Sequence, residues 1–135
     1  MSEANILVCR QFLDLYNQAA WEQLDSVVSP NYIHHSNANQ LNLERFKHGA
    51  AWFRAGMPDF HIDVLDLAAD ADKVFARWVA RGTHIGSFYG ETVTSKTITI
   101  NGITEFRVQN NLIVEDWEAM DELDFMKQVG ASAQG

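Results

Sequence analysis

The hydrophobic pattern of the chain changes its period near residue 60. Before this point apolar residues recur every three or four positions, the spacing of one helix face, and after it they alternate with polar residues, as along a strand. The helical spacing predicts a helix that includes Ile6 to Tyr16, a short helix over 21–28, and a third that Asn42 caps and that Gly56 and Pro58 end. The alternating pattern predicts strands over 60–65, 73–84, 92–109 and 112–120, the third of them bent or broken near Gly102.

This order of elements predicts an α+β domain. Connections of hairpin length, such as Asn110-Asn111, leave no room for crossover helices between the later strands, so we expect a largely antiparallel sheet. Glycines inside strands, such as Gly82 and Gly102, allow the sheet to curve around the helices and enclose a pocket. With 135 residues the chain can form one core but hardly two, so residues 1–135 are predicted to be a single domain.

Charge and cysteine content exclude several classes of protein. Ten Lys and Arg against 18 Asp and Glu give a net charge of −8, which disfavours nucleic acid as a partner. The one cysteine, Cys9, excludes an intrachain disulfide and is expected to be a buried thiol. The sequence has no apolar run of membrane-spanning length and no signal-peptide pattern, so we expect a cytoplasmic protein that does not enter membranes.

Asp121 has two possible roles. On an unbroken strand it would share one face with Trp117 and line an apolar pocket, where desolvation would raise the pKa of its carboxyl toward the range useful for proton transfer. Alternatively, Asp121 only caps a final helical segment that ends at Gly130. The pattern alone slightly favours the cap.

The histidines also allow more than one interpretation. His34 and His35 are neighbours at a strand end, so at most one of them faces a pocket. His84 precedes a glycine-rich loop and either acts in a site or anchors that loop by a hydrogen bond. No HxH or HExxH spacing occurs, so we expect no metal site.

Three motifs follow one another in the second half of the chain. They are Gly-Thr-His-Ile-Gly-Ser-Phe-Tyr-Gly at 82–90, Trp117 with Asp121 four positions later, and Gln128-Val129-Gly130. In this order, with Met57-Pro58-Asp59 before them, they resemble the SnoaL-like polyketide cyclases, also called ester cyclases, of the NTF2-like superfamily. The resemblance covers nearly the whole chain and implies a conical α+β barrel with a deep apolar cavity.

The resemblance also implies a chemistry. True cyclases of this family close a ring by intramolecular aldol condensation without metal or cofactor, and their acid/base aspartate matches Asp121. His35 and His84 match histidines that would assist it, so Asp121, His35 and His84 are the predicted catalytic residues. The predicted substrate-binding residues are Trp117, Tyr32, His34 and Phe88.

The resulting hypothesis is a cofactor-independent enzyme that performs general acid/base, aldol-type chemistry on a small apolar carbonyl or polyketide-like compound. One alternative is an isomerase or hydrolase of the same cavity type, which needs a second carboxylate or a positioned water beside Asp121. Another is a module that binds an apolar ligand without catalysis. The resemblance further implies a homodimer formed through the uncovered face of the sheet.

Overall fold

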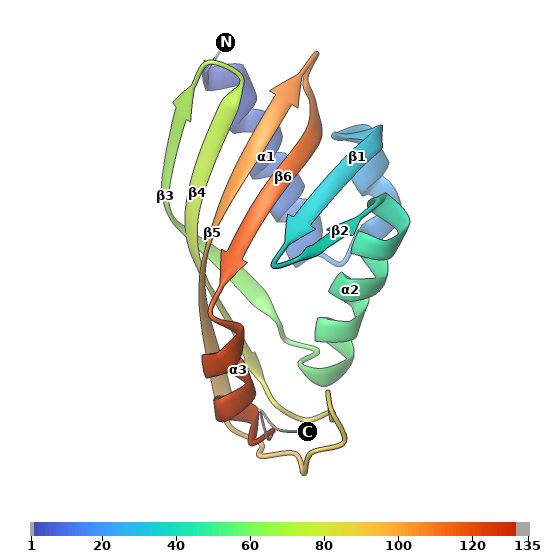
Figure 1. Ribbon diagram of the computed structural model, residues 1–135, viewed down its shortest axis with the longest axis vertical. Helices are drawn as coiled ribbons and strands as arrows, with labels where there is room; N and C mark the ends of the chain where they lie inside the picture. Colours follow the sequence, from blue (N-terminus) through green and yellow to red (C-terminus); the bar gives the residue numbers. More distant parts are fainter. Residues whose placement is uncertain (1, 132–135) are drawn as a thin grey trace.

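The computed structural model describes residues 2–131. Three α-helices and a 3-10 helix accompany six strands. The strands that follow residue 60 lie side by side in the sheet in the order in which they occur in the chain (Figure 1). In chain order the elements are α1 (Ser2–Asn17), η1 (Trp21–Ser26), β1 (Val28–Ser36), β2 (Asn39–Leu41), α2 (Leu43–Gly56), β3 (His61–Asp70), β4 (Lys73–Thr83), β5 (Thr97–Gln109), β6 (Leu112–Met120) and α3 (Glu122–Val129).

The six strands form one curved sheet in the order β2-β1-β6-β5-β4-β3. All neighbouring strands are antiparallel except β1 and β6, which are parallel. α1 packs against β3 to β6 and α2 against β1 and β2, both on the face that carries the cavity described below. The predicted α+β architecture with a mostly antiparallel curved sheet is therefore confirmed.

Local signals in the sequence account for the ends of the helices. The side chain of Asn42 accepts a hydrogen bond from the backbone N–H of Arg45 at 2.9 Å, which begins α2 as predicted. Asp121 does the same for Asp124 at the start of α3, at 3.0 Å. Gly130 ends α3 with a φ of 82°, a left-handed conformation that costs glycine little.

The hairpin between β5 and β6 turns at the predicted pair of asparagines. Asn110 and Asn111 have φ angles of 54° and 63°. Asparagine tolerates this left-handed region better than most residues, and two such residues in succession match the right-handed twist of the flanking strands.

Three predicted boundaries are wrong. The strand predicted over 60–65 extends to Asp70 as β3. The stretch 21–28 is not one helix, because η1 ends at Ser26 and Val28 already pairs with Ile113 of β6 and is buried. Likewise β5 begins at Thr97 rather than at residue 92.

The side chain of Glu91 accepts hydrogen bonds from the backbone N–H groups of Phe88 and Tyr89. These N–H groups therefore have hydrogen-bond partners although their loop does not join the sheet.

Gly102 does not break β5. It pairs with Trp78 of β4, and a Cβ atom at Gly102 would lie 2.2 Å from the indole ring. The missing side chain thus leaves room for Trp78 to lie across the inner face of the sheet.

Cys9 is a buried thiol of α1, as predicted, and burial raises its pKa to about 12, with a smaller contribution from Asp116. None of the helices within residues 2–131 is long and apolar enough to cross a membrane.

Candidate active site

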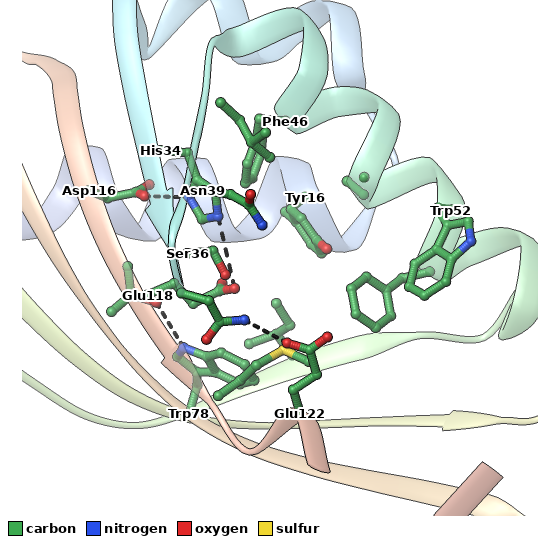
Figure 2. Close-up of a pocket in the computed structure, with 18 of the residues that line it drawn as sticks. Tyr16, His34, Ser36, Asn39, Phe46, Trp52, Trp78, Asp116, Glu118 and Glu122 are labelled. Atoms are coloured by element: carbon green, nitrogen blue, oxygen red, sulfur yellow. Dashed lines mark hydrogen bonds and ion pairs between the residues drawn. The ribbon is translucent and has the colours of Figure 1, made fainter. Parts of the chain in front are cut away.

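A cavity of about 440 Å³ lies between the two long helices and the inner face of the sheet (Figure 2). Its apolar wall is largely aromatic and includes Phe12, Phe46, Trp52, Phe53, Trp78 and Phe106. Its polar lining includes Tyr16, His34, Asn37, Thr104, Asp116, Glu118 and Glu122. Among the described residues, no lysine or arginine lines the cavity, so its charged groups are mostly carboxylates.

The parallel pairing of β1 with β6 brings three of these groups together. His34 lies beside Asp116 in the register, and Ser36 lies beside Glu118. His34 Nδ1 is 2.5 Å from one carboxylate oxygen of Asp116, and its Nε2 is 3.9 Å from Glu118 (Figure 2). The imidazole therefore lies between two carboxylates, with its Nε2 edge toward the cavity.

Asp116 has a second partner, Tyr32. The Tyr32 hydroxyl donates to the other carboxylate oxygen of Asp116 at 2.5 Å, and both residues are 1% exposed. Tyr32 does not line the cavity itself. The residue predicted to bind substrate thus supports Asp116 from behind.

Burial and charge shift the pKa values of this group. Burial raises the pKa of the Glu118 carboxyl, an effect that His34 opposes and Asp116 increases. Burial by itself would lower the pKa of His34, but the hydrogen bond to Asp116 and the charges of both carboxylates outweigh it, so the net shift is upward. Both upward pKa shifts favour the protonated forms of Glu118 and His34, which suits these side chains to proton transfer near neutral pH.

Asp121 and Trp117 do not line the cavity. Asp121 is exposed and caps α3, and Trp117 is 38% exposed on the outer face of the sheet. The reason is a bulge: Arg107 pairs with Glu115 but Val108 pairs with Ile113, which leaves Val114 as an extra residue. The extra residue reverses the alternation, so Asp116 and Glu118 point inward instead.

His35 also lies on the outer face of the sheet. Its ring stacks on Trp117 at 5.0 Å, and its Nε2 is 2.6 Å from Glu115. Of the two neighbouring histidines it is His34 that faces the cavity.

His84 anchors the loop that follows β4. It is 0% exposed, accepts a hydrogen bond from the Thr94 backbone N–H at Nδ1, and contacts Glu91 through Nε2 at 2.6 Å. Phe88 stacks on His84 and packs against Trp52 and Phe125. Neither His84 nor Phe88 lines the cavity, so the loop-anchoring interpretation of His84 describes its position.

Four polar residues of the cavity were not predicted from the sequence, namely Tyr16, Asp116, Glu118 and Glu122. Asp116 and Glu118 on either side of Trp117 were a usable signal, because two acidic residues that alternate with Trp117 must face the side opposite to it. Which of the two sides faces inward depends on the bulge at Val114, for which the sequence carries no marker.

Within residues 2–131 no group of three or more His, Cys, Asp or Glu side chains has an arrangement that could hold a metal ion. The site offers acid/base groups and hydrogen-bond donors in an apolar cavity, which suits proton transfer on a bound organic molecule.

Known structures share this fold over almost the whole chain. A proposed polyketide cyclase of Acidithiobacillus ferrooxidans is 25% identical, with a TM-score of 0.83 over 93% of this chain and 94% of that one. A proposed polyketide cyclase of Bacillus cereus is 26% identical, with a TM-score of 0.83 over 96% and 83%. AclR of Streptomyces galilaeus, a proposed hydroxylase, has a TM-score of 0.88 at 20% identity over 96% and 83%. No curated protein matches the sequence.

The curved sheet, the helices and the cavity that they enclose are those of the NTF2-like fold. The sequence matches the SnoaL-like polyketide cyclases over residues 6–129, and the chain belongs to this family.

Proposed function

We propose that this protein is an enzyme that closes a ring in a small neutral carbonyl compound by an aldol-type addition inside the cavity. The observation that carries the proposal is the inward-facing pair of His34 and Glu118, backed by Asp116 and surrounded by aromatic side chains. Membership in the SnoaL-like polyketide cyclases supports the same reaction class.

Glu118 is the proposed general base and acid. Its carboxylate takes a proton from the carbon next to a substrate carbonyl, and the electron pair of that C–H bond forms the enolate. The enolate carbon then attacks a second carbonyl carbon of the same molecule, and the resulting alkoxide receives the proton back from Glu118. The raised pKa of Glu118 makes it a stronger base than an exposed glutamate.

His34 is the proposed donor to the oxygen on which charge develops. Asp116 accepts from Nδ1, so the other ring nitrogen, Nε2, is directed toward the cavity and Glu118. The raised pKa of His34 favours the protonated ring, which stabilises an enolate more strongly than a neutral donor does.

The lining restricts the substrate. Asp116, Glu118 and Glu122 would repel a carboxylate or phosphate, and no lysine or arginine of the described chain lines the cavity to compensate. The aromatic wall favours a flat apolar body. We therefore expect a neutral ketone or ester rather than a free acid.

An isomerase would use the same first step. If the proton taken by Glu118 returned to a different carbon, the product would be an isomer without a new ring. The products formed from a substrate with two carbonyl groups distinguish the two reactions, because only the aldol-type addition forms a new C–C bond.

The first prediction tests Glu118 without knowledge of the natural substrate. β-Tetralone is a neutral bicyclic ketone, and the exchange of its α-protons in D₂O, followed by ¹H NMR, measures the enolisation step alone. Glu118→Gln keeps the shape of the side chain and removes its proton chemistry. We expect the protein-catalysed exchange to fall by about 10²–10⁴-fold, the usual contribution of a positioned general base.

Asp121→Asn is the matched control, since Asp121 is an exposed cap and asparagine caps helices as well as aspartate does. It should exchange protons like the native protein. Native rates in Glu118→Gln would refute the proposal, and a large loss in Asp121→Asn would return the acid/base role to Asp121.

A further inference from the structure

Tyr16 is a nearly buried residue whose hydroxyl is left without a partner. The residue is 8% exposed and lines the cavity from the last turn of α1. Its hydroxyl forms no hydrogen bond with any side chain or backbone group of residues 2–131, whereas Tyr32, His34 and Asp116 are all bonded to one another. The hydroxyl is not among the fully buried polar atoms and is accessible from the cavity, so a bound ligand can supply the hydrogen-bond partner that residues 2–131 do not.

The ring of Tyr16 is held in one orientation. Its centroid lies 5.4 Å from that of Trp21 and 6.1 Å from those of Phe46 and Phe60. These neighbours pack against the ring on several sides. Figure 2 shows the hydroxyl of Tyr16 directed into the space between the side chains that line the cavity. The direction of the hydroxyl is therefore set before any ligand arrives.

The backbone that carries Tyr16 is fixed as well. Arg54 of α2 donates to the carbonyl oxygens of Tyr16 and Asn17, at 3.1 and 2.9 Å. The Asn17 side chain in turn bonds the backbone of Ile62 in β3 at 2.8 and 2.9 Å. The end of α1 is tied to both neighbouring elements, which is the support that a positioned donor needs.

The hydroxyl keeps its proton. Burial raises the pKa of Tyr16, and the charge of Glu118 adds to this effect while Arg54 opposes it. A phenol that stays protonated beside a carboxylate can donate to a ligand oxygen throughout the physiological pH range.

We propose that Tyr16 donates a hydrogen bond to an oxygen atom of the bound substrate, from the helix wall that faces the His34 and Glu118 pair. A substrate with two carbonyl groups would then be held by His34 from the sheet and by Tyr16 from α1, with its acidic carbon within reach of Glu118. This inference deepens the proposed function and rests on it for the identity of the site, but its hydrogen bond is testable without turnover.

The test compares two probes in native protein and in Tyr16→Phe. Benzoylacetone is a neutral aromatic compound with two carbonyl oxygens, and butylbenzene is a similar shape without oxygen. We expect Tyr16→Phe to bind benzoylacetone about 3- to 10-fold more weakly, the loss of one neutral hydrogen bond, and to bind butylbenzene within about twofold of native affinity.

Folding gives a second readout. Tyr16→Phe removes an unpartnered hydroxyl and should leave the denaturation midpoint of the free protein unchanged or higher, whereas Tyr32→Phe removes a hydrogen bond to buried Asp116 and should lower it.

Three results would overturn the inference: equal loss for both probes, no loss for benzoylacetone, or no binding of benzoylacetone to the native protein at millimolar concentration. Failure of the proposed function can be told apart from failure of this inference. Native proton-exchange rates in Glu118→Gln could coexist with a selective loss of benzoylacetone affinity in Tyr16→Phe.

Discussion

At the scale of single residues, Asp116 organises the candidate site. It is 1% exposed, and both of its carboxylate oxygens are used, one by Tyr32 and one by His34. A buried carboxylate without partners would be strongly destabilising, and two short hydrogen bonds offset that cost. Since His34 Nδ1 is occupied by Asp116, only its Nε2 remains for the cavity.

The second prediction concerns the His34 titration. The hydrogen bond to Asp116 and the charge of Asp116 raise the pKa of His34, so Asp116→Asn should lower it. NMR titration of the imidazole signals measures the change directly. Activity that requires the protonated ring would be lost at a lower pH in the variant. A midpoint that stays constant or rises would contradict the account of the site.

At the scale of elements, acidic side chains that lie close together in β6 and just after it have different roles. The extra residue Val114 turns Asp116 and Glu118 inward, while Asp121 follows the end of the strand and begins α3. Three carboxylates within six positions thus serve a buried hydrogen-bond network, a cavity and a helix cap.

The third prediction tests the role of Asp121 as a helix cap, independently of catalysis. Asp121→Ala should lower the free energy of unfolding by about 1 kcal/mol, because the N–H of Asp124 loses its acceptor. Asp121→Asn should restore most of this stability. Chemical denaturation measures both variants, and native stability in Asp121→Ala would show that the cap contributes nothing.

The loop between β4 and β5 depends on Glu91. Burial raises the pKa of this carboxyl, but hydrogen bonds from the backbone N–H groups of Phe88 and Tyr89 and from His84 outweigh it and lower the pKa to about 2. Because the folded state favours the charged form, Glu91 stabilises the protein above its ordinary pKa of 4.5, and this contribution is lost as the pH falls toward 2.

The fourth prediction follows from that sign. Glu91→Gln should cost about 1.5–3 kcal/mol at neutral pH, the range for hydrogen bonds to a charged group, and should flatten the loss of stability between the two pKa values. Urea denaturation at several pH values measures both effects. If the stability of Glu91→Gln fell with decreasing pH as steeply as that of the native protein, another carboxyl would be the cause of the fall.

At the scale of the whole molecule, the helices cover only the inner face of the sheet. The outer face carries exposed apolar side chains on β1, β4, β5 and β6, namely Ile33, Phe75, Ile103 and Trp117. In the register Glu105 lies between Phe75 and Trp117, so the face is mixed, but exposed apolar side chains on an uncovered sheet face are typical of a surface that another subunit covers.

The fifth prediction is therefore a homodimer formed through this outer face. Ile103→Glu places a charge among the exposed apolar residues and should give a monomer, while the cavity on the opposite face stays intact. Light scattering at micromolar concentration measures both masses. A monomeric native protein would refute the prediction.

Much of the fold could be predicted because its signals are local. Asn42 and Asp121 begin helices, Gly130 ends one, and Asn110 with Asn111 turns the last hairpin, each through bonds or torsions within a few residues of itself. Periodicity added the order of helices and strands, and from these the α+β class follows.

The candidate site could be predicted only in part, since its geometry depends on contacts between distant segments. The sequence by itself identified strand 112–120 and the histidine pair, but pairing with β5 introduced the bulge at Val114 and so decided that Glu118 rather than Trp117 faces the cavity. The parallel pairing with β1 decided that Asp116 meets His34. Local propensity determines what each segment becomes, while a one-residue shift in pairing reverses every side chain that follows, and only the tertiary structure contains that shift.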